Sequence, residues 1–215
     1  LVAASTAALV FSLLASASAR AAPGDLDPTF GTGGKVTTDL GTDPIYGAND
    51  DAYALALQPD GKLVLAGETI QGTAVGLARY NPDGTLDPSF GLGGTIVTDF
   101  YPGSGEGANA VVAQPDGKIV VAGRASAQFL LARYNPDGTL DAAFGSGGSV
   151  LTDFPGSADI AWALALQPDG KLVAAGSSGC AIIALARYNP DGTLDPSFGS
   201  GGKVTARLSD QGDFA

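Results

Sequence analysis

The residues best suited to chemistry in this sequence are oxygen ligands that recur in one short loop. Asn81, Asp83 and Asp87 lie at positions 1, 3 and 7 of a segment that returns twice along the chain. Because Ca²⁺ takes about six to eight oxygen ligands, this spacing suggests a calcium site. The EF-hand pattern also needs a carboxylate at position 5 and glycine at position 6, whereas glycine stands here at position 4. A turn in which Asn and Asp bind their own backbone is the first interpretation, and calcium is the alternative. The candidate ligands are Asn81, Asp83, Asp87, Asn135, Asp137, Asp141, Asn189, Asp191 and Asp195.

The sequence lacks the residues of the common catalytic sites. The chain has no histidine, which excludes Ser-His-Asp and Cys-His triads and imidazole metal sites. The single cysteine, Cys180, cannot form an internal disulfide and is expected to be a small buried side chain. Paired carboxylates can act on glycosides, but aspartates such as Asp60, Asp116 and Asp169 recur with the repeat, and turn formation explains them. We therefore expect no catalytic residue, and no cofactor unless calcium binds.

The formal net charge of -11 restricts the partners. A surface of this sign repels phosphate backbones and anionic lipid, so the sequence disfavours nucleic acid and membrane surfaces as ligands. Cations and basic partners fit the charge better.

One phrase recurs along the chain and decides the architecture. Leu26-Asp27-Pro28-Thr29-Phe30-Gly31 returns with small changes from Leu86, Leu140 and Leu194, at steps of 60, 54 and 54 residues. A unit of this length with several short strands cannot bury both of its faces alone, so the copies must stack on one another. The predicted repeat domain spans 23–215, with repeats at 26–85, 86–139 and 140–193 and part of a fourth at 194–215.

Each repeat contains four segments with strand character, at 34–39, 52–58, 62–67 and 77–80 in the first copy. Val, Leu and Ile alternate there with Ala, which is typical of strands buried on both faces. The sequence therefore predicts an all-β, propeller-like array of four-stranded antiparallel blades. Closed propellers usually need about four to eight blades, so we expect this array to be incomplete and to be joined by further repeats of the same full-length protein.

Short motifs predict the turns and the packing between repeats. Pro59-Asp60-Gly61 and its copies have the composition of a tight hairpin turn. One phenylalanine per repeat is expected to fill the space between neighbouring units, each contributing about 1.5–3 kcal/mol by burial. These are Phe30, Phe90, Phe144 and Phe198.

A recurring arginine inside an apolar strand needs a fixed acceptor. Aspartates recur with the same period after the first segment, so we expect Arg79, Arg133 and Arg187 to pair with Asp39, Asp99 and Asp153.

Loop lengths indicate where a ligand could bind. The connection from the first to the second segment has 12 residues in the first repeat (between Asp39 and Ala52) and 8 and 7 in the next two, whereas the Pro-Asp-Gly turns never vary. In an up-and-down blade the variable connections share one face, which is the natural ligand face, although tolerant solvated loops are the simpler interpretation. The candidates on this face are Asp43, Tyr46, Asn49, Asp50, Asp51, Glu68, Gln71, Tyr101, Glu106 and Asp159.

The motif QPDGK-hydrophobic-AG followed by LARYNPDGTLDxxFGxGG resembles the delta-60 repeat of bacterial secreted and surface proteins. The resemblance covers residues 25–215. It implies β-propeller blades and does not imply a reaction.

The N-terminal residues 1–22 resemble the apolar centre and small-residue cleavage region of a secretory signal peptide. The basic stretch that normally precedes such a region is missing, so we expect the natural start to lie upstream. We expect a secreted or cell-surface protein whose mature chain does not insert into the membrane.

These observations favour an exported interaction module with a protein or glycan ligand. A calcium-stabilised adhesion module and a propeller enzyme acting on carbohydrate are the alternatives.

Overall fold

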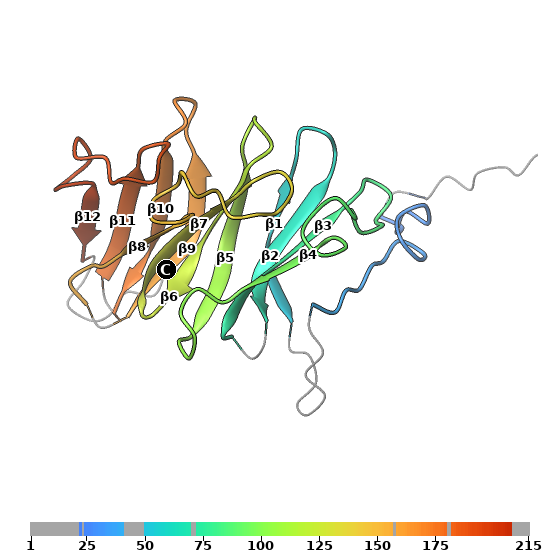
Figure 1. Ribbon diagram of the computed structural model, residues 1–215, viewed down its shortest axis with the longest axis horizontal. Coiled ribbons are helices and arrows are strands. Elements are labelled where there is room, and N and C mark those ends of the chain that lie inside the picture. The colour runs from blue at the N-terminus through green and yellow to red at the C-terminus, as the bar shows by residue number, and fades with distance from the viewer. Residues whose placement is uncertain are drawn as a thin grey trace, which may run out of the picture.

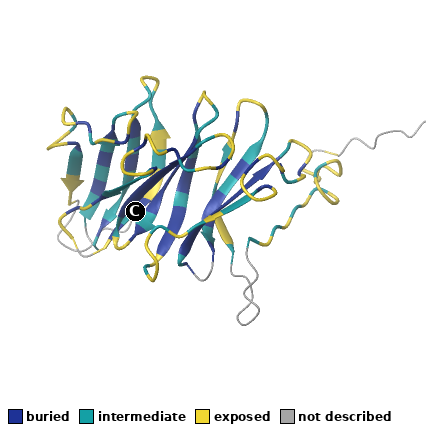
Figure 2. Ribbon diagram, in the orientation of Figure 1, coloured by how far each residue is buried: buried dark blue, intermediate teal, exposed yellow. Residues whose placement is uncertain are grey.

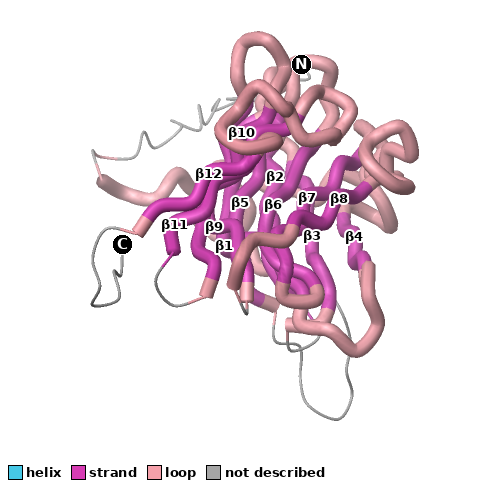
Figure 3. Tube along the Cα trace, turned by 90° about the vertical axis from the view of Figure 1, so that its left-hand side faces the viewer, coloured by secondary structure: helices cyan, strands magenta, loops and turns pink. Residues whose placement is uncertain are grey.

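The computed structural model describes residues 22, 24–40, 50–69, 72–156, 158–179 and 182–207. The regular secondary structure of these residues consists of twelve β-strands, which form three four-stranded antiparallel sheets. The sheets stand in a row along the long axis of the molecule (Figure 1), and a view along this row shows them one behind another (Figure 3). The predicted all-β array of four-stranded antiparallel blades is confirmed.

We number the blades in chain order. Blade 1 consists of β1 (Asp51–Leu57), β2 (Leu63–Thr69), β3 (Ala74–Tyr80) and β4 (Thr95–Thr98). Blade 2 consists of β5 (Glu106–Ala113), β6 (Ile119–Ala125), β7 (Gln128–Tyr134) and β8 (Ser149–Thr152). Blade 3 consists of β9 (Asp159–Leu166), β10 (Leu172–Ser178), β11 (Ile182–Tyr188) and β12 (Lys203–Ala206). Each blade thus takes three strands from one sequence repeat and its fourth strand from the next.

The Pro-Asp-Gly motifs form the predicted hairpin turns between the first and second strands of each blade. In blade 1 the Gln58 amide donates to the Lys62 carbonyl at 2.8 Å, and the Gly61 amide donates back to the Gln58 carbonyl at 2.9 Å. Gly61 has a φ of 84°, a left-handed conformation that other residues adopt only at a cost. The turn chemistry of the sequence therefore fixes the length of this connection.

The core lies between the blades, and the central strands β6 and β7 of the middle blade are buried on both faces. On β6, Val121 belongs to the cluster shared with blade 1, whereas its neighbour Val120 belongs to the cluster shared with blade 3. Adjacent residues of a strand point to opposite faces, so a continuous apolar run serves two interfaces at once. Figure 2 shows the buried positions along the strands and the exposed ones mainly in the loops.

Two of the four recurring phenylalanines fill joints between blades, as predicted, whereas Phe30 and Phe198 are only partly buried. Phe90 and Phe144 are fully buried. Beside Phe90, the Gly91 amide donates to the Asp137 carbonyl of the next blade at 2.8 Å. A Cβ at Gly138 would lie 3.2 Å from the Phe90 ring and 2.8 Å from the Gly91 nitrogen, so only glycine fits at this contact.

The recurring arginines make ion pairs, but the predicted partners are wrong. Arg79 Nε donates to Asp87 at 2.8 Å, eight residues further along the chain, rather than to Asp39. The reason is strand direction: Arg79 lies at the end of β3 next to the Pro-Asp-Gly turns, whereas the predicted aspartates follow the fourth strands at the opposite end of the sheets. Arg79 also donates to the Pro136 carbonyl of blade 2 at 2.6 Å and lies 4.4 Å from the centre of the Phe90 ring. The same pairing replaces the predicted one in the later blades, where Arg133 binds Asp141 instead of Asp99 and Arg187 binds Asp195 instead of Asp153.

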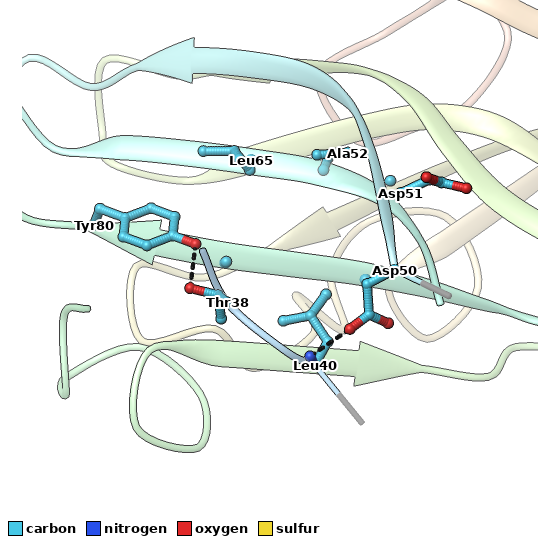
Figure 4. A pocket seen from close by; sticks show the side chains of 11 residues that line it. Thr38, Leu40, Asp50, Asp51, Ala52, Leu65 and Tyr80 are labelled. Atoms are coloured by element: carbon cyan, nitrogen blue, oxygen red, sulfur yellow. Dashed lines mark hydrogen bonds between the residues drawn. The ribbon is translucent and has the colours of Figure 1, made fainter. Parts of the chain in front are cut away.

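The segment before blade 1 occupies the position of a fourth strand. The Tyr80 hydroxyl donates to Thr38 Oγ1 at 2.6 Å (Figure 4). In the next joints Tyr134 donates in the same way to Thr98 of β4, and Tyr188 to Thr152 of β8. Residues 35–40 therefore lie on blade 1 as β4 lies on blade 2.

No helix of the described residues is long and apolar enough to cross a membrane. The predicted signal segment lies outside the described residues, except for Ala22, which is exposed.

Candidate functional site

The strand order places the variable connections together, as the sequence predicted. Within a blade the strands alternate in direction, so the second-to-third connections and the loops between blades leave the sheets at one end. We call this end the loop face; the Pro-Asp-Gly turns lie at the other end. Backbone bonds join the two kinds of connection, since the Glu106 amide donates to the Gly72 carbonyl at 2.8 Å and the Asp159 amide donates to the Ala127 carbonyl at 2.9 Å.

Three of the predicted ligand residues, Asp50, Glu106 and Asp159, hold the loops between blades. The buried Glu106 accepts from the amides of Phe100 at 2.9 Å and Tyr101 at 2.6 Å. Asp159, also buried, accepts from the Phe154 amide at 2.7 Å. Each acid therefore binds its own loop from within.

Asp50, just before β1 of blade 1, also accepts hydrogen bonds from neighbouring segments. It accepts from the Leu40 amide at 2.6 Å and from the Thr69 hydroxyl. A small pocket of about 70 Å³ lies here, between Leu40 and the outer face of β2 and β3 (Figure 4). Thr38 and Leu40 line it from the segment that lies on this face.

The remaining predicted residues are distributed along the loop face. Asp51 begins β1 and is exposed, and Tyr101 is exposed in the loop between blades 1 and 2. Glu68 lies near the end of β2 and is discussed below. Asp43, Tyr46, Asn49 and Gln71 lie outside the described residues.

The candidate calcium ligands are engaged with donors of their own loop. Asp83 Oδ1 accepts from the amide of Thr85 at 2.9 Å and from its hydroxyl at 2.7 Å, and these hydrogen bonds lower the pKa of Asp83. Asn81 donates to the Thr85 hydroxyl at 3.0 Å. Burial raises the pKa of Asp87, but hydrogen bonds from Ser89 and Lys62 and the charge of Arg79 outweigh it and hold that pKa well below its usual range. Within the described residues no group of three or more His, Cys, Asp or Glu side chains is placed to hold a metal.

Most of these bonds recur in the two later copies of this loop, except that Asp141 accepts from the amide of Ala143 and has no hydroxyl donor equivalent to Ser89. Asn135, Asp137 and Asp141 repeat them in blade 2, and Asn189, Asp191 and Asp195 in blade 3.

A second surface, which the sequence analysis did not single out, lies along the first strands of the blades. β1, β5 and β9 each contain a β-bulge at the same repeat position, occupied by Tyr53, Asn109 and Trp162. A bulge inserts one unpaired residue and re-aims its side chain. We call the surface that carries these three side chains the inner surface.

Glycines opposite the bulges explain why the strands deviate there. A Cβ at Gly67 would lie 1.7 Å from the Asp51 carbonyl oxygen, and one at Gly123 would lie 1.9 Å from the Gly107 carbonyl oxygen. The bulged strand thus comes closer than a side chain allows. Glycine within an apolar strand is the sequence signal of such a bulge, and it was present in every repeat.

The three bulge residues and Arg124 of β6 line one hollow of about 420 Å³. This volume is in the range of small-molecule sites. Tyr53 is 49% exposed and Trp162 is 53% exposed, so two large aromatic side chains from different blades remain accessible. Since β5 contacts both β1 and β9, the side chains of three blades meet at this hollow.

Hydrogen bonds fix the polar ends of the side chains in the hollow. The Tyr53 hydroxyl donates to Glu68 Oε1 at 2.9 Å, which raises the pKa of Tyr53, and Arg124 Nη2 lies 3.1 Å from Glu68 Oε2. Asn109 Nδ2 donates to the Ala161 carbonyl at 2.9 Å. Trp162 Nε1 donates to the Ser177 hydroxyl at 3.2 Å. Among the described residues predicted for ligand binding, Glu68 is the one with direct bonds to this cluster.

Comparison with known proteins agrees with the fold. Residues 58–90, 114–144 and 167–198 match the family model described as "Domain of unknown function (DUF5122) beta-propeller". These three segments are therefore similar to β-propeller repeats, which agrees with the array of four-stranded blades. Each matched segment runs from the glutamine before a Pro-Asp-Gly turn to the recurring phenylalanine, and leaves out the first strand with its bulge.

No curated protein matches this chain in sequence. Among solved structures, the PQQ-bound aldose sugar dehydrogenase from Streptomyces coelicolor is 16% identical, with a TM-score of 0.43, over 73% of this chain and 53% of that one. A protein from Lactobacillus plantarum is 15% identical, with a TM-score of 0.40, over 67% of this chain and 40% of that one. The chain therefore spans about half, or less, of these structures.

Proposed function

We propose that this chain is part of an exported β-propeller that acts as a non-catalytic interaction module and binds its ligand on the inner surface. The observation that carries the proposal is the set of bulge residues Tyr53, Asn109 and Trp162. Their neighbours in the strands are alanines that recur from blade to blade, whereas the bulge position carries a different side chain in each blade. A scaffold repeat with one varied, accessible position per blade suits recognition of a ligand.

A non-catalytic role is supported by the use of the carboxylates. Asp83 and Asp87 bind donors of the recurring loop, and Glu106 binds the backbone of a connection. These acids stabilise local structure, and their partners recur or are buried with them. Glycoside hydrolysis needs two carboxyl groups that act as acid and base, whereas the structural contacts of these acids account for their presence.

Export is supported by the sequence of residues 1–22, with its uncharged apolar run and small residues near the end. We place the protein outside the cytoplasm, secreted or at the cell surface. Expression of the gene with its natural start, followed by fractionation of the cells, tests this: recovery in the cytoplasmic fraction alone contradicts export.

Further repeats of the same protein are the partners proposed for the outer face of blade 1. Leu55 and Leu57 are 61% and 67% exposed there, whereas Val111, the equivalent of Leu55 in blade 2, is buried under blade 1. Through the Thr38–Tyr80 bond, residues 35–40 already occupy part of this face in the position of a fourth strand. Leu57→Lys is expected to destabilise the full-length protein more than the isolated chain, and equal effects contradict the proposal.

The binding function is tested by a thermal-shift screen. The panel contains neutral and acidic oligosaccharides, basic and acidic peptides, and nucleotides. A ligand of the inner surface raises the melting temperature of the wild type and of Tyr101→Ala, a matched exposed tyrosine of the loop face. It has no effect on the triple variant Tyr53→Ala, Asn109→Ala, Trp162→Ala. Shifts that survive in the triple variant, or a panel without any shift, contradict the proposal.

A further inference from the structure

We propose that the hollow of the inner surface is a binding site for neutral carbohydrate, with Tyr53 and Trp162 as stacking platforms. This inference rests on the proposed function and names its ligand class. It is argued from the accessible rings, the polar groups beside them and the local charge.

The two aromatic side chains are accessible, yet held at their polar ends. Tyr53 is held by Glu68 and Trp162 by Ser177, while about half of each side chain remains exposed. A ring that is fixed before binding loses little conformational entropy when a ligand stacks on it. Flat apolar surfaces of this kind match the C–H face of a sugar ring, because the aromatic face is electron-rich.

The polar side chains of the same hollow supply both donors and acceptors. Arg124 uses Nη2 for Glu68, and a guanidinium carries five N–H groups in total. Asn109 uses one amide hydrogen for the Ala161 carbonyl, and a carboxamide has a second hydrogen and an acceptor oxygen. A ligand with many hydroxyl groups, each both donor and acceptor, satisfies such a mixed set.

The charge of the site selects neutral ligands. Arg124 is paired with Glu68, and the exposed Asp51 adds a negative charge that acts on Tyr53, so the hollow has no excess positive charge, and the whole chain carries -11. Acidic polysaccharides and nucleic acids are repelled by this field. An organic cation is attracted by the net charge of the chain, but beside the two rings it meets the Arg124 guanidinium, which lines the same hollow. A neutral saccharide pays neither cost.

The intrinsic fluorescence of Trp162 gives a direct test, since it is the only tryptophan of the chain. Neutral cello-, xylo-, malto- and chito-oligosaccharides are titrated against the whole chain, with oligogalacturonate as the acidic counterpart. We expect a saturable change of emission with at least one neutral series, and binding of the acidic series weaker by about tenfold or more. Tyr53→Ala is expected to weaken binding by about tenfold, Tyr53→Phe to keep most of it, and the control Tyr101→Ala to leave it unchanged.

Several results overturn the inference. Unfolding midpoints of the variants establish first that each is folded, and both exposed tyrosines are replaceable without opening the core. No response to any neutral series up to about 10 mM, or equal affinity of wild type and Tyr53→Ala, rejects carbohydrate as the ligand. If a peptide of the thermal-shift panel then changes the Trp162 emission, the proposed function stands without this ligand class. If nothing does, both fall.

Discussion

Replacing Arg133 by alanine tests how the blades are joined. The buried Arg133 binds Asp141 through Nε at 2.7 Å and the Pro190 carbonyl of blade 3 through Nη1 at 2.5 Å. Its guanidinium also lies 4.5 Å from the centre of the Phe144 ring. The Arg133 side chain therefore contacts its own blade, the next blade and the Phe144 ring that fills the joint between them.

The expected loss follows from these contacts. Removing one partner of a buried ion pair costs about 3–5 kcal/mol. Lys118 stays 2.9 Å from Asp141 and compensates part of this, while the bond to the Pro190 carbonyl and the ring contact are lost outright. We expect Arg133→Ala to lower the free energy of unfolding by about 3 kcal/mol.

Arg187→Ala is the matched control. Arg187 binds Asp195 at 2.8 Å and Ser197 at 3.1 Å, but its side chain is 21% exposed, and no further blade follows it within the described residues. A charged hydrogen bond contributes about 1.5–3 kcal/mol, and of these two arginines Arg133 alone makes one to a following blade among the described residues. The control should therefore lose about 1 kcal/mol, roughly 2 kcal/mol less than Arg133→Ala.

Urea unfolding followed by far-UV circular dichroism measures both variants. The account predicts a lower midpoint for Arg133→Ala than for Arg187→Ala, at a similar slope. Equal midpoints would refute the idea that the arginine joins neighbouring blades, and would reduce it to a contact within one loop.

Three further predictions concern stability, the first two measured by urea unfolding and the third by the melting temperature. Ala127 has a φ of 61° in the hairpin between β6 and β7, so Ala127→Gly should raise the free energy of unfolding by about 1 kcal/mol, and a loss contradicts the assigned turn. The second prediction concerns acid. The pKa of Asp141 is lowered, mainly by the hydrogen bond from Lys118 and also by the charge of Arg133, and the pKa of Asp87 is lowered as well. Because these folded-state values are lowered, their stabilisation is complete above the unfolded value of about 4 and is lost as the pH falls through the folded values; a stability that does not decline in acid contradicts this. Replacing EDTA by millimolar Ca²⁺ should leave the melting temperature unchanged, since Asp87 is held by Arg79 and Lys62, and a rise would restore the calcium interpretation.

Features set by a few adjacent residues could be predicted from the sequence. The Pro-Asp-Gly turn depends on four residues in a row, and the strand pattern depends on alternation within seven. The burial of Phe90 and Phe144 followed from the same logic, because one large ring per repeat must pack somewhere between units that share their faces.

Features set by the direction and register of strands could not be predicted from the sequence. The acceptor of Arg79 depends on which end of the sheet each side chain reaches, and two aspartates recur with the same period. Sequence spacing alone cannot choose between Asp39 and Asp87. Glu106 and Asp159 looked accessible in variable loops, but they turn inward to bind loop amides that the sequence leaves unassigned.

The inner surface was missed for a related reason. Alternation of apolar residues continues through the bulge, so Tyr53 and Trp162 resembled ordinary strand positions. The informative residues were the glycines on the neighbouring strand, whose meaning depends on the pairing of β1 with β2. One residue of register shift decides whether a side chain enters the core or faces the hollow.

Acrylamide quenching of the fluorescence of Trp162 tests most directly whether the bulges direct these side chains to an accessible inner surface. With Trp162 53% exposed, the account predicts long-wavelength emission and efficient quenching of the folded chain, little changed on unfolding. Short-wavelength emission that resists quenching until the protein unfolds would place Trp162 in the core and contradict the site.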